Sequence, residues 1–451
     1  MSAAQRRTKR IMMISTHGYV AAEPEFGKPD TGGQVVYVLE LSKCLARMGY
    51  RVDILTRRFE DQAAVEQVSD RVRVLRFACG GSDFIPKETL YEAIPEWVEN
   101  AVHYIRSKKL NYTFINSHYW DAGLAGQALS NRLDVPHFHT PHSIGSWKRD
   151  NMDGDRKDNN TKYNFERRIR EEKVVYDECD QLIATTPKQR EILEYTEYDI
   201  PPEKINVIPP GYDDQRFFPV SRASRTALKE ELGMQGQMVL ALGRMAKNKG
   251  YDLLIKGMPA VFNRIPDARL MLAVGSSDPP ESEIQQINEL KKLAEELGIA
   301  DRILFHGYIP DEQLADYYRA ADVFCLCSRY EPFGMTAVEA MACGTPTVIT
   351  TEGGLWEQVV WGSDALYANP FDPEAYGHAI AAIMQHAEVT NRLSRFGSQK
   401  ARMKFTWTGI AQQLLQLLET TQSQRMQLED RVTERRTPAE EAGWKRAAAL
   451  S

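Results

Sequence analysis

The chain has 451 residues, of which 43% are hydrophobic and 26% charged, a composition typical of globular proteins. Its 56 Lys and Arg residues against 62 Asp and Glu residues give a formal charge of -6, which argues against a broad surface for nucleic-acid phosphates. The apolar run at residues 11–14 is too short for a signal peptide, and no run is long enough to span a membrane. We therefore expect a cytoplasmic protein that binds neither nucleic acid nor membrane.

Short β-branched runs alternate with amphipathic stretches along most of the chain, a pattern that predicts parallel α/β sheets. In the first half, helices are expected at residues 34–48, 96–106, 122–133 and 163–179. Strands are expected at residues 11–16, 51–56, 72–77, 112–117, 137–140, 181–185 and 205–208. The very polar stretch Ser146–Thr161 is expected to be a mobile surface loop.

The stretch from Gly211 to Gln237 lacks a strand signal and is expected to connect two domains. Beyond it, strands are expected at residues 238–242, 269–274, 303–305, 323–326, 345–350 and 365–367. Terminal helices are expected at residues 373–386, 388–404 and 406–419. We thus expect an N-terminal domain of residues 1–212, a C-terminal domain of residues 213–404, a terminal helix at 405–421 that crosses back to the first domain, and a charged tail at 422–451.

Cysteines and histidines are the first candidates for a metal site. The six cysteines are scattered through apolar segments without a Cys-x-x-Cys pair, so we expect buried free thiols. His137 and His139 alternate on a predicted strand, and His142 lies in the loop beyond it. A zinc site stays open as an alternative there, although no Cys or carboxylate stands at ligand spacing. We favour packed strand histidines, with His142 as a polar contact in a cleft.

Two glycine-containing turns follow predicted strands, where ligands of open α/β sheets bind. Asp30-Thr31-Gly32-Gly33-Gln34 allows close approach of the backbone to a ligand and opens a helix whose N–H groups suit an anion. The alternative is a plain turn. The motif is not Gly-x-Gly-x-x-Gly, which argues against a nicotinamide dehydrogenase. A second pair, Gly353-Gly354, follows a strand of the second half.

Charged residues mark another strand end. Arg244, Lys247 and Lys249 suit a diphosphate, although a solvated loop would look similar. Glu331 and Glu339 are separated by seven residues, and Gly334 and Met335 should begin a helix between them. Both carboxylates can then line one site at different depths. Alternatively, one glutamate caps the helix and the other is a helix residue with its hydrogen bonds satisfied within the protein.

Together these motifs carry a family resemblance. Glu-x7-Glu, preceded by Arg-Met-x-x-Asn-Lys-Gly and followed by Gly-Gly, resembles the retaining GT-B glycosyltransferases of family four. The N-terminal motifs are similar to those of the sucrose-phosphate synthase group, and most of all to its mannosylfructose-phosphate synthase branch. These motifs are Ile-Ser-Thr-His-Gly (14–18), Asp-Thr-Gly-Gly-Gln (30–34), Phe-Ile-Pro-Lys-Glu (84–88), His-Tyr-Trp-Asp-Ala-Gly (118–123), His-Ser-Ile-Gly (142–145), Arg-Arg-Ile (167–169) and Ile-Pro-Pro-Gly (208–211). The resemblance spans residues 10–420 and leaves out the tail.

The resemblance implies an α/β fold of two Rossmann-like parallel-sheet domains that face a cleft. It implies that Arg244 and Lys249 neutralise a leaving diphosphate and that Glu331 and His142 contact the donor hexose. Other donor-binding residues would be Gly33, Phe333, Gly334, Met335 and Glu339, the last through the ribose hydroxyls. The acceptor, a sugar phosphate, would be held by Gln34, Lys87, Tyr119, Lys148 and Arg168. Two departures stand out: Pro141 replaces the usual Gly, and the loop around Lys148 has diverged.

The implied partners are a nucleotide sugar and a sugar phosphate. The implied reaction moves mannose from GDP-mannose to fructose 6-phosphate and gives mannosylfructose phosphate and GDP. Sucrose 6-phosphate synthesis from UDP-glucose is the alternative, and a noncatalytic nucleotide-sugar-binding protein is an alternative of another class. A pyridoxal-dependent phosphorylase would need a lysine at the donor phosphate, and the Glu-x7-Glu context disfavours it. We expect no bound metal and no tightly bound cofactor, with Mg²⁺ at most assisting departure of the diphosphate.

Overall fold

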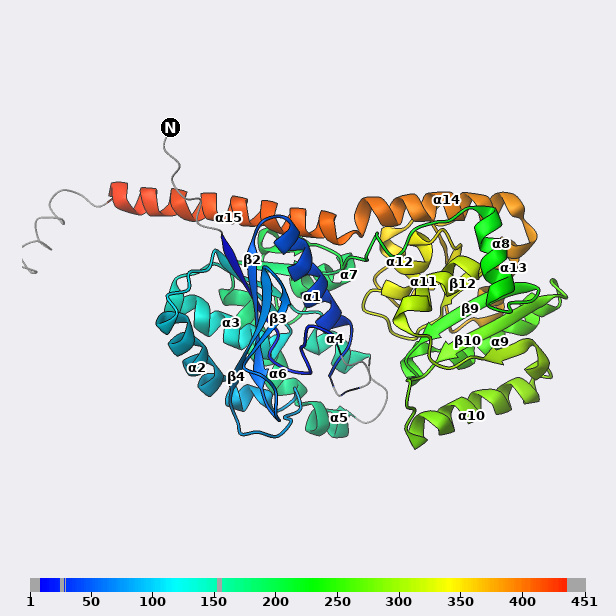
Figure 1. Ribbon diagram of the computed structural model, residues 1–451, viewed down its shortest axis with the longest axis horizontal. Coiled ribbons are helices and arrows are strands. Elements are labelled where there is room, and N and C mark those ends of the chain that lie inside the picture. Colours follow the sequence, from blue (N-terminus) through cyan, green and yellow to red (C-terminus); the bar gives the residue numbers. More distant parts are fainter. Residues whose placement is uncertain (1–8, 25–27, 29, 152–155, 436–451) are drawn as a thin grey trace, which may run out of the picture. The chain divides into compact units, whose positions relative to one another are not determined.

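The computed structural model describes residues 9–24, 28, 30–151 and 156–435 (Figure 1). Residues up to Ile410 belong to one compact unit, which contains two open α/β sheets, and residues from Ala411 belong to a second. Within the described part of the chain, no helix is long and apolar enough to cross a membrane.

The first sheet has the strand order β3-β4-β2-β1-β5-β6-β7-β8 and is parallel except at its β3 edge. Its strands are β1 (Arg10–Ile14), β2 (Arg51–Arg58), β3 (Val65–Ser69), β4 (Val72–Ala78), β5 (Phe114–His118), β6 (His137–Thr140), β7 (Gln181–Ala184) and β8 (Ile205–Val207). The accompanying helices are α1 (Gly33–Arg47), α2 (Ile94–Ser107), α3 (Trp120–Leu133), α4 (Gly145–Asp150), α5 (Arg156–Tyr163), α6 (Phe165–Glu178) and α7 (Pro187–Tyr195). Figure 1 shows α2 and α3 beside this sheet.

The second sheet is parallel throughout and has the order β11-β10-β9-β12-β13-β14. Its strands are β9 (Gln237–Gly243), β10 (Ala268–Val274), β11 (Ile303–Phe305), β12 (Val323–Leu326), β13 (Thr347–Thr350) and β14 (Leu366–Ala368). The helices are α8 (Arg222–Glu231), α9 (Tyr251–Phe262), α10 (Glu281–Glu296), α11 (Asp311–Ala320), α12 (Met335–Ala342), α13 (Pro373–Gln385) and α14 (Ala387–Lys404), followed by α15 (Trp407–Arg435).

Apolar runs explain why these strands form the core. Residues Ile11 to Ile14 of β1 are fully buried, as expected for a parallel strand covered on both faces. Ile14 is paired with Leu55 of β2 on one side and with Ser117 of β5 on the other. The expected buried thiols are confirmed, because all six cysteines are free and buried. The GT-B prediction of two parallel-sheet α/β domains agrees with this architecture.

Two sequence-based expectations were wrong or incomplete, the loop at residues 146–161 and the end of the last helix. Ser146–Thr161 was expected to be a loop, yet α4 and α5 occupy most of it, with residues 152–155 outside the described part. Helix α4 packs against α6, and Gly145 N donates to Glu172 Oε2 at 2.9 Å. These buried contacts fix a segment whose sequence is very polar. The stretch expected to connect the domains holds no named strand between β8 and β9, in line with its sequence, and contains α8, whose Arg225 donates to Arg319 O at 2.9 Å. The last helix extends beyond the expected Glu419 to Arg435.

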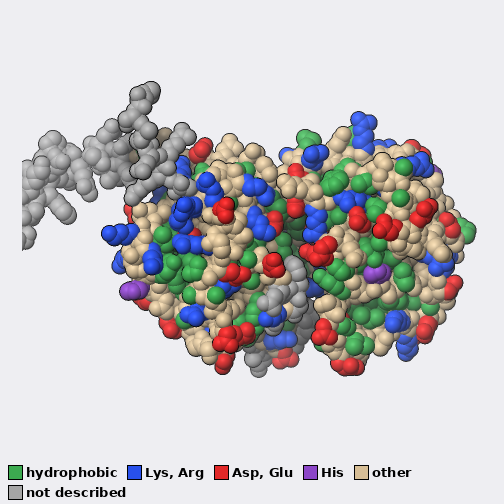
Figure 2. Space-filling model, in the orientation of Figure 1, with side chains coloured by type: hydrophobic (Ala, Val, Ile, Leu, Met, Phe, Trp, Pro, Cys, Tyr) green, Lys and Arg blue, Asp and Glu red, His purple; other side chains and the backbone are tan. Residues whose placement is uncertain are grey.

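The surface carries both signs of charge. On the face that Figure 2 shows, Lys and Arg side chains are interspersed with Asp and Glu, in line with the small net charge of -6.

Candidate active site

Strand order marks one switch point in each sheet. In the first sheet, β2 lies on one side of β1 and β5 on the other; in the second, β10 and β12 flank β9 in the same way. Ligands of open α/β sheets bind outside the carboxyl ends of the strands at such points. The segments that follow β1, β5, β9 and β12 contain most of the residues singled out from the sequence.

At the first switch point, Gln34 joins the ends of β1 and β5. Its amide nitrogen donates to Ser15 Oγ at 3.1 Å and to the carbonyl oxygen of His118 at 3.2 Å. Gly33 is the exposed first residue of α1, and a Cβ built on it would meet nothing within 4 Å. The packing of the fold therefore does not require glycine there.

Two of the predicted site residues have strained backbones. Tyr119, between the end of β5 and the start of α3, has φ 77° and ψ 161°, a region that is almost exclusive to glycine. His142 has φ 58° and is the centre of a tight turn in which Ser143 N donates to Pro141 O at 2.7 Å. Such strain costs about 1–3 kcal/mol per residue and tends to cluster at functional sites.

Tyr119 and Arg168, two of the residues predicted to bind the acceptor, are joined by a hydrogen bond, and Arg168 is buried. Arg168 donates to Glu172 Oε1 at 2.7 Å and to Tyr119 Oη at 2.9 Å, and it also bonds the carbonyl oxygen of Ser143. The side chains of Arg168 and Glu172 are 3% and 0% exposed, so this ion pair is buried. Burial opposes the charge of Arg168, but Glu172 and Tyr119 outweigh it and raise its pKa.

Two lysines complete this basic cluster. Burial, together with the positive charges of Arg168 and Lys87, lowers the pKa of Lys148 to about 8. Lys148 Nζ lies 4.7 Å from the ring centre of Tyr163. Lys87 is paired with Asp30, and although burial opposes its charge, Asp30 and Glu88 raise its pKa. The three cations predicted to hold one phosphate thus influence one another, although they come from distant parts of the chain.

At the second switch point, Lys249 and Glu331 form an ion pair of 2.7 Å between Nζ and Oε2. Their side chains are 20% and 13% exposed, and Ser328 Oγ donates to the same carboxylate oxygen at 3.2 Å. Gly250 positions the lysine, because a Cβ there would lie 2.1 Å from the carbonyl oxygen of Cys327. Arg244 follows β9 and is exposed.

Helix α12 begins between the two glutamates, as its sequence predicts. Gly334 precedes Met335 with φ 112°, a backbone conformation that favours glycine. The N–H groups of the first helical turn have no acceptor within the helix. Phe333 is buried, so its backbone rather than its ring is left for a ligand.

Glu339 lies one turn further along α12. Burial raises its pKa to about 7, although the hydroxyl of Tyr318, which donates to Oε2 at 2.9 Å, and the charge of Arg216 act in the opposite direction. Gly353 lies beside the other glutamate, since Glu331 N donates to Glu352 O at 2.9 Å and a Cβ on Gly353 would meet Glu331 O at 2.8 Å.

With this geometry established, comparisons with known proteins identify the family. The model of the family described as "Glycosyltransferase Family 4" matches residues 31–216, and that of "Glycosyl transferases group 1" matches residues 225–400. A mannosylfructose-phosphate synthase of Agrobacterium fabrum is 54% identical over 417 residues, which cover 92% of each chain. The chain belongs to the family 4 glycosyltransferases.

Other members of this glycosyltransferase family match the chain over most of its length. A D-inositol 3-phosphate glycosyltransferase of Corynebacterium glutamicum is 32% identical over 90% of this chain and 96% of its own. A solved sucrose-phosphate synthase from Thermosynechococcus elongatus is 31% identical, with a TM-score of 0.78, over 92% of this chain and 99% of its own. This family 4 glycosyltransferase is therefore a hexosyltransferase with the GT-B fold.

Several residues beside the site were not singled out from the sequence. Asp121, at the start of α3, accepts from Thr16 Oγ1 at 2.6 Å and lies 2.9 Å from His17 Nδ1, so it anchors the segment after β1. Glu172 holds Arg168, and its spacing of four residues on a helix is the signal that could have revealed it. Within the described residues, no group of three His, Cys, Asp or Glu side chains could hold a metal ion.

The strand histidines are packed. His137 Nε2 and His139 Nδ1 lie 2.6 Å and 2.8 Å from Ser117 Oγ, and both rings are fully buried.

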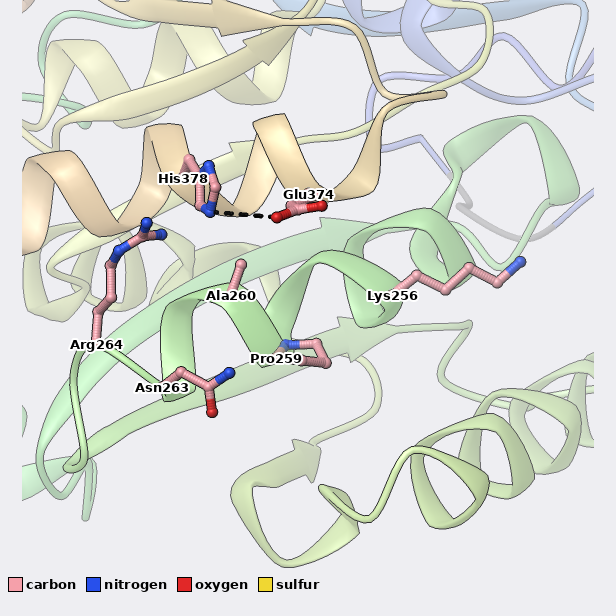
Figure 3. A pocket seen from close by; sticks show the side chains of 7 residues that line it. All are labelled: Lys256, Pro259, Ala260, Asn263, Arg264, Glu374 and His378. Atoms are coloured by element: carbon pink, nitrogen blue, oxygen red, sulfur yellow. Dashed lines mark ion pairs between the residues drawn. The ribbon is translucent and has the colours of Figure 1, made fainter.

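Elsewhere, a surface pocket of about 460 Å³ lies between α9 and α13 (Figure 3) and contains none of the predicted site residues. It is lined by Lys256, Pro259, Ala260, Asn263, Arg264, Glu374 and His378.

Proposed function

We propose that the protein transfers mannose from GDP-mannose to fructose 6-phosphate, with retention of anomeric configuration, to give mannosylfructose phosphate and GDP. The observation that carries the proposal is the 54% identity over 92% of the chain to a mannosylfructose-phosphate synthase, together with a basic cluster where a sugar phosphate is expected.

The acceptor assignment is supported by the charges at the first switch point. A phosphate dianion between Arg168, Lys87 and Lys148 would relieve the repulsion that lowers the pKa of Lys148. Arg168 is already oriented by Glu172 and Tyr119, so little side-chain freedom would be lost when a phosphate binds. Gln34 would then contact the sugar from the end of β1.

The donor assignment is supported by charge at the second switch point. Arg244 and Lys249 would stabilise the negative charge that grows on the diphosphate as the glycosidic bond breaks. In the proposed step, the bond from the anomeric carbon to the diphosphate breaks and a bond to the acceptor oxygen forms on the same face. A diphosphate oxygen takes the proton of the acceptor hydroxyl. Mg²⁺ would assist departure of the diphosphate without being required.

Donor identity rests on the relative rather than on a residue that reads the base. Mannose and glucose differ only at the 2-hydroxyl group, and UDP-glucose is the second candidate because a sucrose-phosphate synthase is 31% identical and shares the fold. A noncatalytic nucleotide-sugar-binding protein would have no need of Arg244 or Lys249, and both are present.

A matrix of four nucleotide sugars against fructose, fructose 6-phosphate and glucose 6-phosphate tests the proposal. We expect the highest kcat/KM for GDP-mannose with fructose 6-phosphate, since an unpaired buried polar group costs about 1–3 kcal/mol for a wrong substrate. A higher kcat/KM with UDP-glucose would contradict the donor. Absence of turnover with every pair would contradict catalysis altogether. Activity in the presence of EDTA, raised by added Mg²⁺, is the expected metal dependence.

A further inference from the structure

Two histidines at the ends of adjacent strands share one hydrogen bond. His118 is the last residue of β5, and His142 lies just beyond β6. Nδ1 of His118 is 2.9 Å from Nε2 of His142. His118 is fully buried and His142 is half-buried. One proton lies between the two nitrogens, so one ring donates and the other accepts.

The surroundings of His118 decide the direction of this bond. Its other nitrogen, Nε2, is buried and has no hydrogen-bond partner within the described residues. If His142 donated, His118 would carry its proton on Nε2, and a buried N–H group without an acceptor is rare and costly. If His118 donates from Nδ1, only a lone pair is left unpaired. The second arrangement places the proton of His142 on Nδ1, because its Nε2 accepts.

We infer that His118 is a positioning residue that fixes His142 as the Nδ1–H tautomer and leaves this N–H free to donate to an oxygen of the donor hexose. The inference rests on the proposed function for the ligand, whereas the tautomer itself does not depend on any substrate. A histidine without such a partner can adopt two tautomers and two ring orientations, whereas the bond to His118 selects one of each for His142.

Three further observations support this arrangement. Nδ1 of His142 has no hydrogen-bond partner among the residues that the structure describes, so it is left for a ligand. Tyr37 packs edge-on against His142 with ring centres 4.8 Å apart, which holds the imidazole plane. Burial, followed by the charge of His17, lowers the pKa of His142 to about 3, and burial also lowers that of His118. His142 is therefore a neutral imidazole that donates a hydrogen bond and does not transfer a proton.

The tautomer can be observed directly in the wild-type protein. Nitrogen-15 NMR of ring-labelled histidine distinguishes protonated from unprotonated ring nitrogens, and His142→Gln assigns the signals. We expect His142 to carry its proton on Nδ1 between pH 6 and pH 8 in the full-length protein without substrates. A proton on Nε2 of His142 would overturn the inference, whichever donor the enzyme uses.

Kinetics then test the positioning role. Asparagine places its amide N–H near the position of the histidine Nδ1–H, so His118→Asn should retain most activity, whereas His118→Leu should lose about tenfold in kcat, the equivalent of one net hydrogen bond. Acceptor KM should not change, and the exposed His103→Asn serves as the control. Equal losses in His118→Asn and His118→Leu, with unchanged thermal melting, would contradict the role. If His118→Leu does not fold, the NMR measurement still tests the tautomer, and the activity retained by His118→Asn still tests the positioning role.

Discussion

Lys249 Nζ lies 2.7 Å from Glu331 Oε2, so the ends of β9 and β12 are joined by an ion pair between two residues assigned to different parts of the donor. The pair is partly buried, and Ser328 also donates to the carboxylate. Arg244, by contrast, is exposed. Substitution of the two cations should therefore have different consequences for stability and similar ones for catalysis.

The first prediction concerns these two cations. Arg244→Ala should leave the melting temperature unchanged and lower kcat by about 10²–10³, the typical effect of one lost contact to transition-state charge. Lys249→Met should lower kcat as much, but it should also destabilise the fold because Glu331 loses its partner. Steady-state kinetics and thermal melts check both, with Lys292→Ala on α10 as the exposed control outside the site. A near-normal kcat in either variant would remove that residue from the diphosphate site.

The second prediction concerns the acceptor phosphate. Arg168→Ala would be hard to interpret, because loss of one partner of a buried ion pair costs about 3–5 kcal/mol. Among the residues that the structure describes, Lys148 forms no ion pair, so Lys148→Met should fold normally and raise the KM for fructose 6-phosphate about tenfold without affecting the KM for fructose. Lys162→Met is a matched control, since Lys162 is exposed and contacts the same Tyr163 ring at 5.1 Å.

The pH dependence of acceptor binding gives a second readout for Lys148. Burial and neighbouring cations lower its pKa to about 8, so the ammonium loses its proton as the pH rises through 8. The KM for fructose 6-phosphate should increase above that pH in the wild type and stay flatter in Lys148→Met. Parallel curves for the two proteins would mean that another group causes the change.

The sequence predicts the alternation of strands and helices well, because buried parallel strands are continuous apolar runs such as that of β1. It does not reveal β3, an edge strand with alternating exposure, or α4, whose polar residues surround a small buried side. Nor does it reveal the positive φ angles of Tyr119 and His142, because such conformations are uncommon outside glycine and the sequence carries no signal for them here. Such conformations are imposed by tertiary contacts, which the sequence does not show.

The third prediction uses the raised pKa of Glu339. The folded protein holds the proton up to a pKa of about 7, whereas the unfolded chain releases it near the ordinary value of 4.5. Between these values the native state binds more protons, so the free energy of unfolding falls as the pH rises and levels off above 7. Glu339→Gln has no carboxyl group there, so its free energy of unfolding should not fall in this way. The melting temperature of Glu339→Gln minus that of the wild type should therefore increase from pH 5 to pH 8. No change in that difference would contradict the pKa.

Nucleotide binding should show the opposite trend at the same residue. If Glu339 accepts hydrogen bonds from ribose hydroxyls, the ionised carboxylate binds better than the neutral acid, and the affinity for GDP should increase through pH 7. Hydrogen bonds to a charged group contribute about 1.5–3 kcal/mol, so Glu339→Gln should weaken binding at pH 8 and change it little at pH 5.5. Calorimetric titration of both proteins with GDP separates this effect from titration of the phosphate, which is common to both. An equal loss at both pH values would place the ribose elsewhere.

The fourth prediction tests Gly33, whose place in the fold does not demand glycine. It is the first residue of α1, and an added Cβ would meet no heavy atom within 4 Å. Where the native backbone tolerates alanine, Gly→Ala stabilises a protein by about 0.4–1 kcal/mol, because the unfolded chain loses freedom. Gly33→Ala should therefore melt at the same temperature or slightly higher. If a donor oxygen approaches the backbone N–H at this helix start, the methyl group should obstruct it and raise the donor KM at least tenfold. The KM for fructose 6-phosphate is the internal control and should stay within twofold, because the basic cluster of Lys87, Lys148 and Arg168 is untouched. A stable Gly33→Ala variant with an unchanged donor KM would show that the glycine belongs to a plain turn and that the donor does not reach α1.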